Sequence, residues 1–349
     1  MPEKMPDNFV HTSYAARVVF GPGSLDQVPH EIELLDVRRV LVIATRSARQ
    51  AADNVQAGLK ERFAGRIDGV RQHVPAEVAE AARAKAREVD ADGVVAIGGG
   101  SAIGLAKAIA LSNNVRILAV PTTYSGSEMT PVWGETSGGS KTTGTDVRVL
   151  PSTVVYDPTL TLDLPLSTTA ASVANALAHC VEAVWTEKAN PITETTAVEA
   201  ARALTRGLRQ VLREPADEAA RGDLLYGACL AGSALASAGT GIHHKLCHLL
   251  GGTYNLPHAE THAAVLPQVT RVKAAEVPRA KARLEEALET DDLATGLFDL
   301  FTAANVPTSL QALGLTRAQA VEAARAFPGD VEEMLTRAWA GARPEGATR

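Results

Sequence analysis

The sequence predicts an α/β domain built on a parallel sheet, followed by an all-helical domain. Short runs of β-branched residues alternate with helical patterns in the first half of the chain. A glycine triplet directly follows one of these runs, and after Pro165 the strand patterns give way to long Ala- and Leu-rich helical patterns. Buried strands that alternate with helices are typical of parallel sheets, because each crossover between parallel strands needs a helix.

In the first half, the expected strands are short apolar runs and the expected helices are the amphipathic patterns between them. The third strand is stopped by Gly98-Gly99-Gly100 and the fourth by Pro121. The strands are expected at residues 40–44, 67–74, 93–97 and 116–120, and the helices at residues 48–63, 76–89 and 102–111.

In the second half, only helical periodicity remains. Helices are expected at residues 170–186, 192–212, 219–236, 243–250, 260–272, 277–288, 292–303, 317–327 and 331–339. The segment at residues 157–164 breaks the pattern with Pro and Asp. We therefore place an α/β domain at residues 1–161 and a helical domain at residues 162–349.

Bulk composition excludes several classes of protein. The 349 residues are too many for one ordinary domain and fit two. A formal net charge of -6 gives no basic footprint, so a nucleic-acid partner is not expected. The cysteines lie in apolar helical patterns without a CxxC pair, which indicates reduced thiols. With no apolar leader and no apolar run of about 18 residues, we expect a cytoplasmic protein without a membrane partner.

Two loops after neighbouring strands carry the residues that suit a phosphate. The first consists of Gly98, Gly99, Gly100 and Ser101, where glycines let the backbone approach a phosphate and a helix begins. The second provides Thr122, Thr123, Ser125 and Ser127. This is not the GxGxxG fingerprint, and each loop alone also fits a tight or polar connection. Together, at the carboxyl ends of adjacent parallel strands, they predict a dinucleotide-binding crevice.

Histidines gather in the helical half. Five of the nine lie within twenty positions, and a sixth, His179, lies upstream. His244 and His248 share one helix face, as do Asn175 and His179. No carboxylate stands at the position of Asn175, so a metal ion there would meet only imidazoles and no neutralising charge. The cluster therefore favours hydrogen-bond donors and general acids over a metal site. Its members are His179, His243, His244, His248, His258 and His262.

With these motifs in view, the sequence resembles the iron-containing alcohol dehydrogenase family over nearly its whole length. The resemblance begins at Phe20-Gly21-Pro22-Gly23, includes both loops and the Asp157-Pro158 turn, and reaches Pro267. It implies a Rossmann-like first domain and a helical second domain of the kind also found in dehydroquinate synthases. Metal-dependent members bind iron or zinc through one Asp and three His.

Departures from that family pattern match its maleylacetate reductase subgroup. Asn175 replaces the ligand aspartate and Gly104 replaces the aspartate of the glycine loop. The subgroup's patterns GGGSxxGLAKA, TYSGSEMTP, HHKLCHxLGG and PHAETHA are all present. The resemblance implies reduction of the carbon–carbon double bond of maleylacetate, and of chloro-substituted forms, to a 3-oxoadipate during aromatic degradation. It further implies NADH or NADPH as cofactor, no metal, and a homodimer.

The same resemblance suggests roles for individual residues. His179, His244 and His258, at the former ligand positions, would donate hydrogen bonds to the substrate ketone. His243 or His248 would supply a proton. Lys245 either binds a carboxylate of the dicarboxylate substrate or is a solvated helix residue, and the sequence favours neither. Thr45, after the first strand, carries no charge that would repel the 2′-phosphate of NADPH, and Arg46 would attract it.

Three other functions remain open at this stage. The chain would be a metal-dependent alcohol dehydrogenase if iron or zinc tolerated Asn175. A lyase resembling 3-dehydroquinate synthase would need zinc and a basic phosphate set, which the sequence lacks near the histidines. A non-catalytic ligand-binding relative would leave buried imidazoles without use, which is unfavourable.

Overall fold

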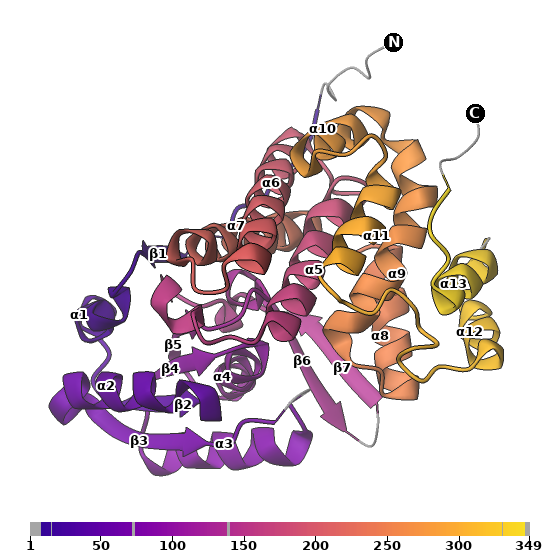
Figure 1. Cartoon of the computed structure of the whole chain (residues 1–349). Helices are drawn as coiled ribbons and strands as arrows, with labels where there is room; N and C mark the ends of the chain where they lie inside the picture. Colours follow the sequence, from indigo (N-terminus) through magenta and orange to yellow (C-terminus); the bar gives the residue numbers. More distant parts are fainter. Residues whose placement is uncertain (1–7, 15, 72–73, 138–139, 330, 346–349) are drawn as a thin grey trace. The chain divides into compact units, whose positions relative to one another are not determined.

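The computed structural model describes residues 8–14, 16–71, 74–137, 140–329 and 331–345, and Figure 1 shows their helices and strands. The chain forms two compact units. The first comprises residues 13–164 together with Ala216–Leu225, and the second comprises residues 8–12, Pro165–Pro215 and residues 226–345. The division into domains at residues 1–161 and 162–349 stays a prediction.

The first unit contains a six-stranded sheet in the order β1-β8-β5-β4-β2-β3, in which all neighbouring strands are parallel. Three of the four interior strands, β2, β4 and β5, are rich in Val, Ile and Ala and almost entirely buried, as a sheet covered on both faces requires. The strands are β1 (Arg17–Phe20), β2 (Val40–Ala44), β3 (Phe63–Asp68), β4 (Gly93–Gly98), β5 (Arg116–Pro121) and β8 (Thr153–Tyr156).

Helices cover both faces of this sheet. On one face, α1 (Val28–Leu34) and α2 (Arg49–Leu59) pack in a core with Val42, Ile97 and Val120. On the other face, α3 (Ala76–Glu88) and α4 (Gly100–Ser112) pack in a core with alternate residues of the same strands. The parallel α/β fold expected from the sequence is confirmed.

Several elements of the first unit differ from the sequence-based expectation. The strand expected at residues 67–74 runs instead from Phe63 to Asp68, because Gly69 adopts a positive φ of 84° and ends it. Residues 72–73 of that prediction lie outside the described residues. The strands β1 and β8 were not expected, nor was the antiparallel pair β6 (Val132–Ser137) and β7 (Ser140–Thr145).

The second unit is helical, and every helix expected in this half is present with shifted ends. Within it, α9 packs against α5, α8, α11 and α13. Several helix starts are capped by side chains, with Asn190 before α6, Asp292 before α11 and Thr316 before α12. The helices are α5 (Leu166–Ala183), α6 (Pro191–Arg213), α7 (Glu218–Ala238), α8 (Ile242–Tyr254), α9 (His258–Lys273), α10 (Pro278–Leu288), α11 (Leu293–Ala303), α12 (Arg317–Ala324) and α13 (Val331–Ala340). Of these, α7 belongs to the first unit up to Leu225.

Among the described residues, no single helix is long and apolar enough to cross a membrane. The helices α7 and α8 meet the length and composition criteria only as a pair that is bent by 102°.

Candidate active site

The carboxyl ends of three neighbouring strands bring the predicted cofactor residues together in the first unit. Thr45 follows β2, and its backbone N–H donates to the carbonyl of Ile97 at the end of β4 over 3.2 Å. Thr122 follows β5, and its N–H donates to the carbonyl of Gly98 over 3.0 Å. The two loops therefore lie side by side, as ligand-binding loops do at the carboxyl edge of a parallel sheet.

The glycines of the first loop are required by space. A Cβ atom on Gly98 would lie 2.7 Å from Cγ2 of Thr45, and one on Gly99 would lie 3.0 Å from Thr123. A Cβ atom on Gly100 would approach Oγ of Ser125. Gly98, which also has a positive φ of 149°, therefore requires glycine, and the neighbouring contacts show how closely the two loops approach each other.

The start of α4 offers free donors to an anion. Gly100 and Ser101 form its first turn, which has no side-chain cap and no acidic residue. The Oγ atom of Ser125 is buried and has no hydrogen-bond partner within the described part of the chain. Backbone N–H groups at a helix start and an unpaired hydroxyl match the needs of a dinucleotide phosphate, so these residues fit the expected NAD(P)H.

In the second unit, three helices supply a buried cluster of imidazoles. His179 lies on α5, His243 and His244 begin α8, and His262 lies on α9, and each side chain is at most 5% exposed. Ring centroids lie 5.1 Å apart for His179 and His244, and 4.8 Å apart for His244 and His262. Residues separated by more than 80 positions in the sequence thus form one polar centre inside an apolar helical core.

A carboxylate that the sequence analysis did not single out organises this centre. Glu182, on α5, is fully buried and accepts a hydrogen bond from Nδ1 of His244. Its Oε1 atom also accepts from the backbone N–H of His243 over 2.8 Å, at the start of α8. Burial raises the pKa of Glu182, but its electrostatic interaction and hydrogen bond with His244, together with backbone donors at the start of α8, outweigh this and lower the pKa to about 2. The sequence analysis expected no carboxylate at the position of Asn175, and it missed the negative charge that Glu182 brings to the cluster seven positions further along α5.

His243 and His262 form a second pair within the cluster. Nε2 of His243 and Nδ1 of His262 share a hydrogen bond of 2.8 Å, so one of the two rings donates and the other accepts. Burial lowers the pKa of His243 to about 3 and lowers the pKa of His262 well below its usual value. Both rings are neutral at physiological pH, and each has one nitrogen without a partner among the described residues.

The remaining predicted residues lie at the margin. His248 and His258 are half-buried, and His258 stands first in α9, with its ring centroid 4.5 Å from that of His262. Lys245 is exposed, whereas its neighbours His243 and His244 are buried. The structure therefore brings the predicted histidines together but leaves the Lys245 side chain on the surface of α8.

The residues at the ligand positions of metal-dependent relatives do not fit the iron set of that family. Asn175 provides a neutral amide oxygen in place of a carboxylate, and Glu182 is already bonded to His244 and to the start of α8. The imidazoles whose ligand atoms lie within 4.8 Å of one another are His243, His244 and His262, of which only His244 holds a family ligand position.

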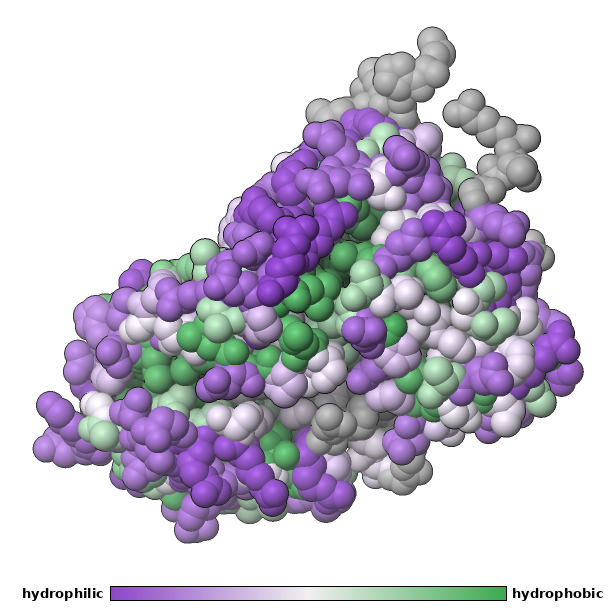
Figure 2. Space-filling view, viewed as in Figure 1, coloured by the Kyte–Doolittle hydropathy of each residue, from purple (hydrophilic) through white to green (hydrophobic). Residues whose placement is uncertain are grey.

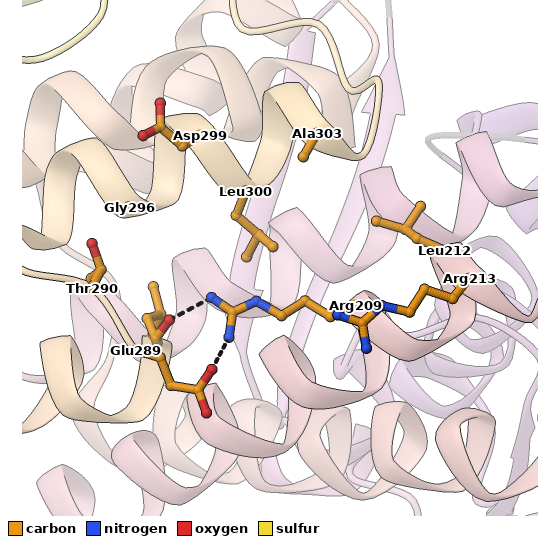
Figure 3. Close-up of a pocket in the computed structure, with 10 residues that line it drawn as sticks. Arg209, Leu212, Arg213, Glu289, Thr290, Gly296, Asp299, Leu300 and Ala303 are labelled. Carbon is orange, nitrogen blue, oxygen red and sulfur yellow. Dashed lines mark hydrogen bonds and ion pairs between the residues drawn. The ribbon is translucent and has the colours of Figure 1, made fainter.

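A separate pocket of about 480 Å³ lies between α6, α10 and α11 of the same unit (Figure 3). Figure 2 shows hydrophobic surface in this hollow, bordered by hydrophilic side chains. Arg209 spans it, pairs with Glu289 and donates to the carbonyl of Leu288 over 2.8 Å. None of the histidines line the pocket, so it is not part of the polar centre.

Glu182 and His262 were not assigned a function in the sequence analysis, although the sequence contains a signal for each. Asn175, His179 and Glu182 are spaced i, i+4 and i+7, and so share one face of a helix. His262 belonged to the expected cluster but was given no function. Glu182 and His262 matter because they contact His244 and His243. These contacts depend on how α5, α8 and α9 pack, which the sequence pattern does not show.

The fold and these two sites define a class of protein: an oxidoreductase with a dinucleotide-binding first unit and a helical second unit that carries a histidine centre. The sequence-family model for iron-containing alcohol dehydrogenases matches residues 15–158. The family model for the C-terminal part of Fe-containing alcohol dehydrogenases matches residues 169–334. The chain belongs to the iron-containing alcohol dehydrogenase family.

Within this family, the similar proteins include many maleylacetate reductases. Maleylacetate reductase 1 of Rhodococcus opacus is 45% identical, over 96% of this chain and 98% of its own. That of Sphingobium indicum is 44% identical, over 96% and 99%. The crystal structure of maleylacetate reductase from Rhizobium sp. strain MTP-10005 has a TM-score of 0.91 and 41% identity, and covers 97% of this chain and 100% of its own. The resemblance drawn from the sequence motifs is confirmed.

Proposed function

We propose that this chain reduces the carbon–carbon double bond of maleylacetate to give 3-oxoadipate in aromatic degradation, with NADH or NADPH as the reductant. The observation that carries the proposal is the 45% identity with a maleylacetate reductase over 96% of the chain. The subgroup motifs support it, because they include Asn175 and Gly104, where the metal-dependent relatives carry aspartates.

The cofactor is bound by the first unit. Gly98, Gly99, Gly100 and Ser101 would hold its pyrophosphate, with Thr122, Thr123, Ser125 and Ser127 on the neighbouring loop. Thr45 and Arg46 would interact with the adenine ribose. Acceptance of both cofactors is supported by Arg46, which is exposed and forms no ion pair within the described residues.

The chemistry begins at the alkene carbon that is β to the ketone. Bound NADH or NADPH supplies a hydride to this carbon. Negative charge then develops on the ketone oxygen as an enolate, so catalysis requires hydrogen-bond donors fixed at that oxygen. His179, His244 and His258 are the candidates for these donors.

Glu182 prepares His244 for this task. A carboxylate only accepts, so Nδ1 of His244 carries a proton and its ring is oriented by Glu182. Nε2 of His244 has no partner within the described residues. A proton carried on this atom would face the enolate, and the carboxylate of Glu182 would balance its charge.

One proton must reach the carbon α to the ketone to complete the reduction, because the hydride and this proton are the only atoms added to the double bond. His248 and His243 are the candidates. His243 is neutral and hydrogen-bonded to His262, so transfer from it would be followed by proton movement along this pair. Lys245 is a candidate for binding a carboxylate group of the substrate, because it follows His244 on α8 and has a long, flexible side chain.

The experiment that tests the function also tests metal independence. The enzyme is treated with a chelator, its metal content is measured, and oxidation of NADH and NADPH with maleylacetate is followed. Turnover in the metal-free enzyme would support both proposals. The competing function is a metal-dependent alcohol dehydrogenase, and the convergence of His243, His244 and His262 favours it because three imidazoles are a known zinc set. Activity on simple alcohols that appears only with zinc or iron would establish that alternative.

For the protein in the cell, we propose a cytoplasmic homodimer that acts on small dicarboxylates and has no nucleic-acid or membrane partner. The net charge of -6 supports the absence of a nucleic-acid partner, and the homodimer follows from the family resemblance. Light scattering coupled to size-exclusion chromatography checks the oligomeric state, and a mass of one chain would contradict the dimer.

A further inference from the structure

Beneath the cofactor loops of the first unit lies a buried cation that the proposed reaction does not use. Lys107 is on α4 and is 1% exposed. Its Nζ atom donates to the backbone carbonyls of Ser127, Thr130 and Val132 over 2.7, 2.8 and 2.8 Å. It also lies 3.1 Å from the hydroxyl of Thr130.

These contacts account for all the donors of a lysine ammonium group. An ammonium group has three N–H bonds, and three carbonyls surround Nζ here. Burial lowers the pKa of Lys107 to about 7, and Glu128 nearby opposes that effect. Because the carbonyls accept every proton of the charged form, this form is the one that fits the geometry.

The carbonyls that Lys107 gathers belong to one turn of the second cofactor loop. This turn contains Gly126 at a positive φ of 71° and the short helix Ser127–Met129. Glu128, fully buried, accepts a hydrogen bond from the hydroxyl of Tyr156 over 2.9 Å and ties the same turn to β8. The turn is thus held from α4 and from the sheet.

The position of Lys107 on α4 links both cofactor loops. The first turn of α4 carries Gly100 and Ser101, whose N–H groups are the proposed donors to the phosphate. Two turns further along, Lys107 fixes the loop that places Ser125 beside Gly100. One helix therefore supplies the phosphate donors and also holds the opposite wall of the cradle.

We propose that Lys107 is a positioning residue for the nicotinamide cofactor: its ammonium group holds the Ser125–Thr130 turn in the shape that binds the dinucleotide. This inference rests on the proposed role of that loop in cofactor binding. Lys107 touches neither cofactor nor substrate and acts through the loop.

The test compares cofactor binding and kinetics in the full-length protein. In Lys107→Met, we expect the Kd for NADH, followed by fluorescence, to rise about tenfold or more, because the turn loses three hydrogen bonds to a charged donor. The KM for NADH should rise in parallel, while the KM for maleylacetate and the kcat at saturating NADH change little. A general loss of structure would instead change all of these together.

A milder variant covers the case in which Lys107→Met does not fold. The hydroxyl of Thr130 lies near Nζ and donates to the carbonyl of Ser127 over 3.2 Å, and Thr130→Val removes only this group. Its Kd for NADH should rise several-fold. The matched control is Thr153→Val, since the hydroxyl of Thr153 is buried on β8 without a partner among the described residues. That control should bind NADH as the unaltered protein does.

The outcomes separate this inference from the proposed function. If the unaltered protein binds neither NADH nor NADPH, the proposed cofactor site is wrong. If it binds them normally and both Lys107→Met and Thr130→Val leave the Kd unchanged, only the role of Lys107 is overturned. In a double variant with Ser125→Ala, the two losses should be less than additive, because both act on one loop.

Discussion

At the scale of single residues, the carboxylate of Glu182 fixes the tautomer of His244. In Glu182→Gln, one amide oxygen would replace the two carboxylate oxygens that now accept from Nδ1 of His244 and from the N–H of His243, and no negative charge would balance a proton on Nε2. We expect kcat with maleylacetate to fall by about 10²- to 10⁴-fold, in the range seen when a general acid loses its partner. The KM for NADH should be unchanged, because the first unit binds the cofactor. Steady-state kinetics with both substrates varied measure the two effects.

The control for this substitution is Glu187→Gln, which removes an exposed carboxylate from the segment after α5. It should leave kcat unchanged. A Glu182→Gln enzyme with normal kcat would contradict the role assigned to the pair, and the enolate would then have to be stabilised without the charge on His244.

Arg46 carries the second prediction at this scale. Its guanidinium group is exposed and free of ion pairs within the described residues, beside Thr45 at the end of β2. We expect Arg46→Glu to reduce kcat/KM with NADPH by about tenfold or more, because a carboxylate repels the 2′-phosphate, while kcat/KM with NADH changes little. Kinetics with the two cofactors test this, and an equal loss with both would show that Arg46 does not face the 2′-phosphate.

Sequence reasoning reached the histidines but not their partners, for a physical reason. The spacing of His244 and His248, or of Asn175 and His179, is visible within one helix because it follows the helical repeat. The bonds from Glu182 to His244 and from His243 to His262 join different helices. Such contacts depend on helix packing, which the local pattern does not encode. The individual catalytic roles stay predictions.

At the scale of elements, α7 approaches α6 closely at Gly227. A Cβ atom on Gly227 would lie 2.6 Å from Cγ of Leu204, which is fully buried on α6. We expect Gly227→Val to lower the free energy of unfolding by about 1–3 kcal/mol, because the helices must separate or repack. Urea denaturation measures the loss.

The matched control is Gly252→Ala on α8, where an added Cβ atom would meet nothing within 4 Å. There the substitution should be neutral or should stabilise by about 0.5–1 kcal/mol, since alanine is the better helix former. A Gly227→Val protein as stable as the control would show that α6 and α7 adapt without strain.

Elements were predictable where their pattern was long or fully buried. The expected helices of the second half repeat apolar residues at helical spacing, and the central strands β2, β4 and β5 are continuous apolar runs. The edge strand β1 has four residues, of which only Val19 is buried, so it has no such pattern. The hairpin β6–β7 is rich in Thr, Ser and Gly, and pairing rather than composition makes it a sheet.

At the scale of the whole molecule, the two units bury ionisable groups whose titration couples to folding. Burial lowers the pKa values of His179, His243 and His262. In the unfolded chain these histidines titrate near their ordinary value of about 6.5. Below that pH the unfolded state therefore binds more protons than the folded state, and the free energy of unfolding falls as the pH falls. For His243 the loss continues down to about pH 3.

Glu128 acts in the opposite direction over part of this range. Burial raises its pKa to about 7, so the folded state takes up one proton that the unfolded state takes up only near pH 4.5. The unfolded histidines are half protonated at about pH 6.5 and almost fully protonated at about pH 5, so the excess of protons on the unfolded chain grows from less than one to about two across this window. Each proton changes the stability by about 1.4 kcal/mol per pH unit, so we expect the loss to steepen from about 1 to about 3 kcal/mol per pH unit as the pH falls from 6.5 to 5.

Equilibrium urea denaturation at several pH values between 5 and 6.5 tests this expectation, in a window above the range where ordinary carboxylates titrate. His262→Gln removes one of the proton-binding groups and should lower the slope by about 1.4 kcal/mol per pH unit at the acid end of this window. A stability that is flat over this window would mean that the histidines are protonated in the folded protein. The centre would then hold several positive charges beside Glu182, and the neutral pair of His243 and His262 in the proposed proton path would be wrong.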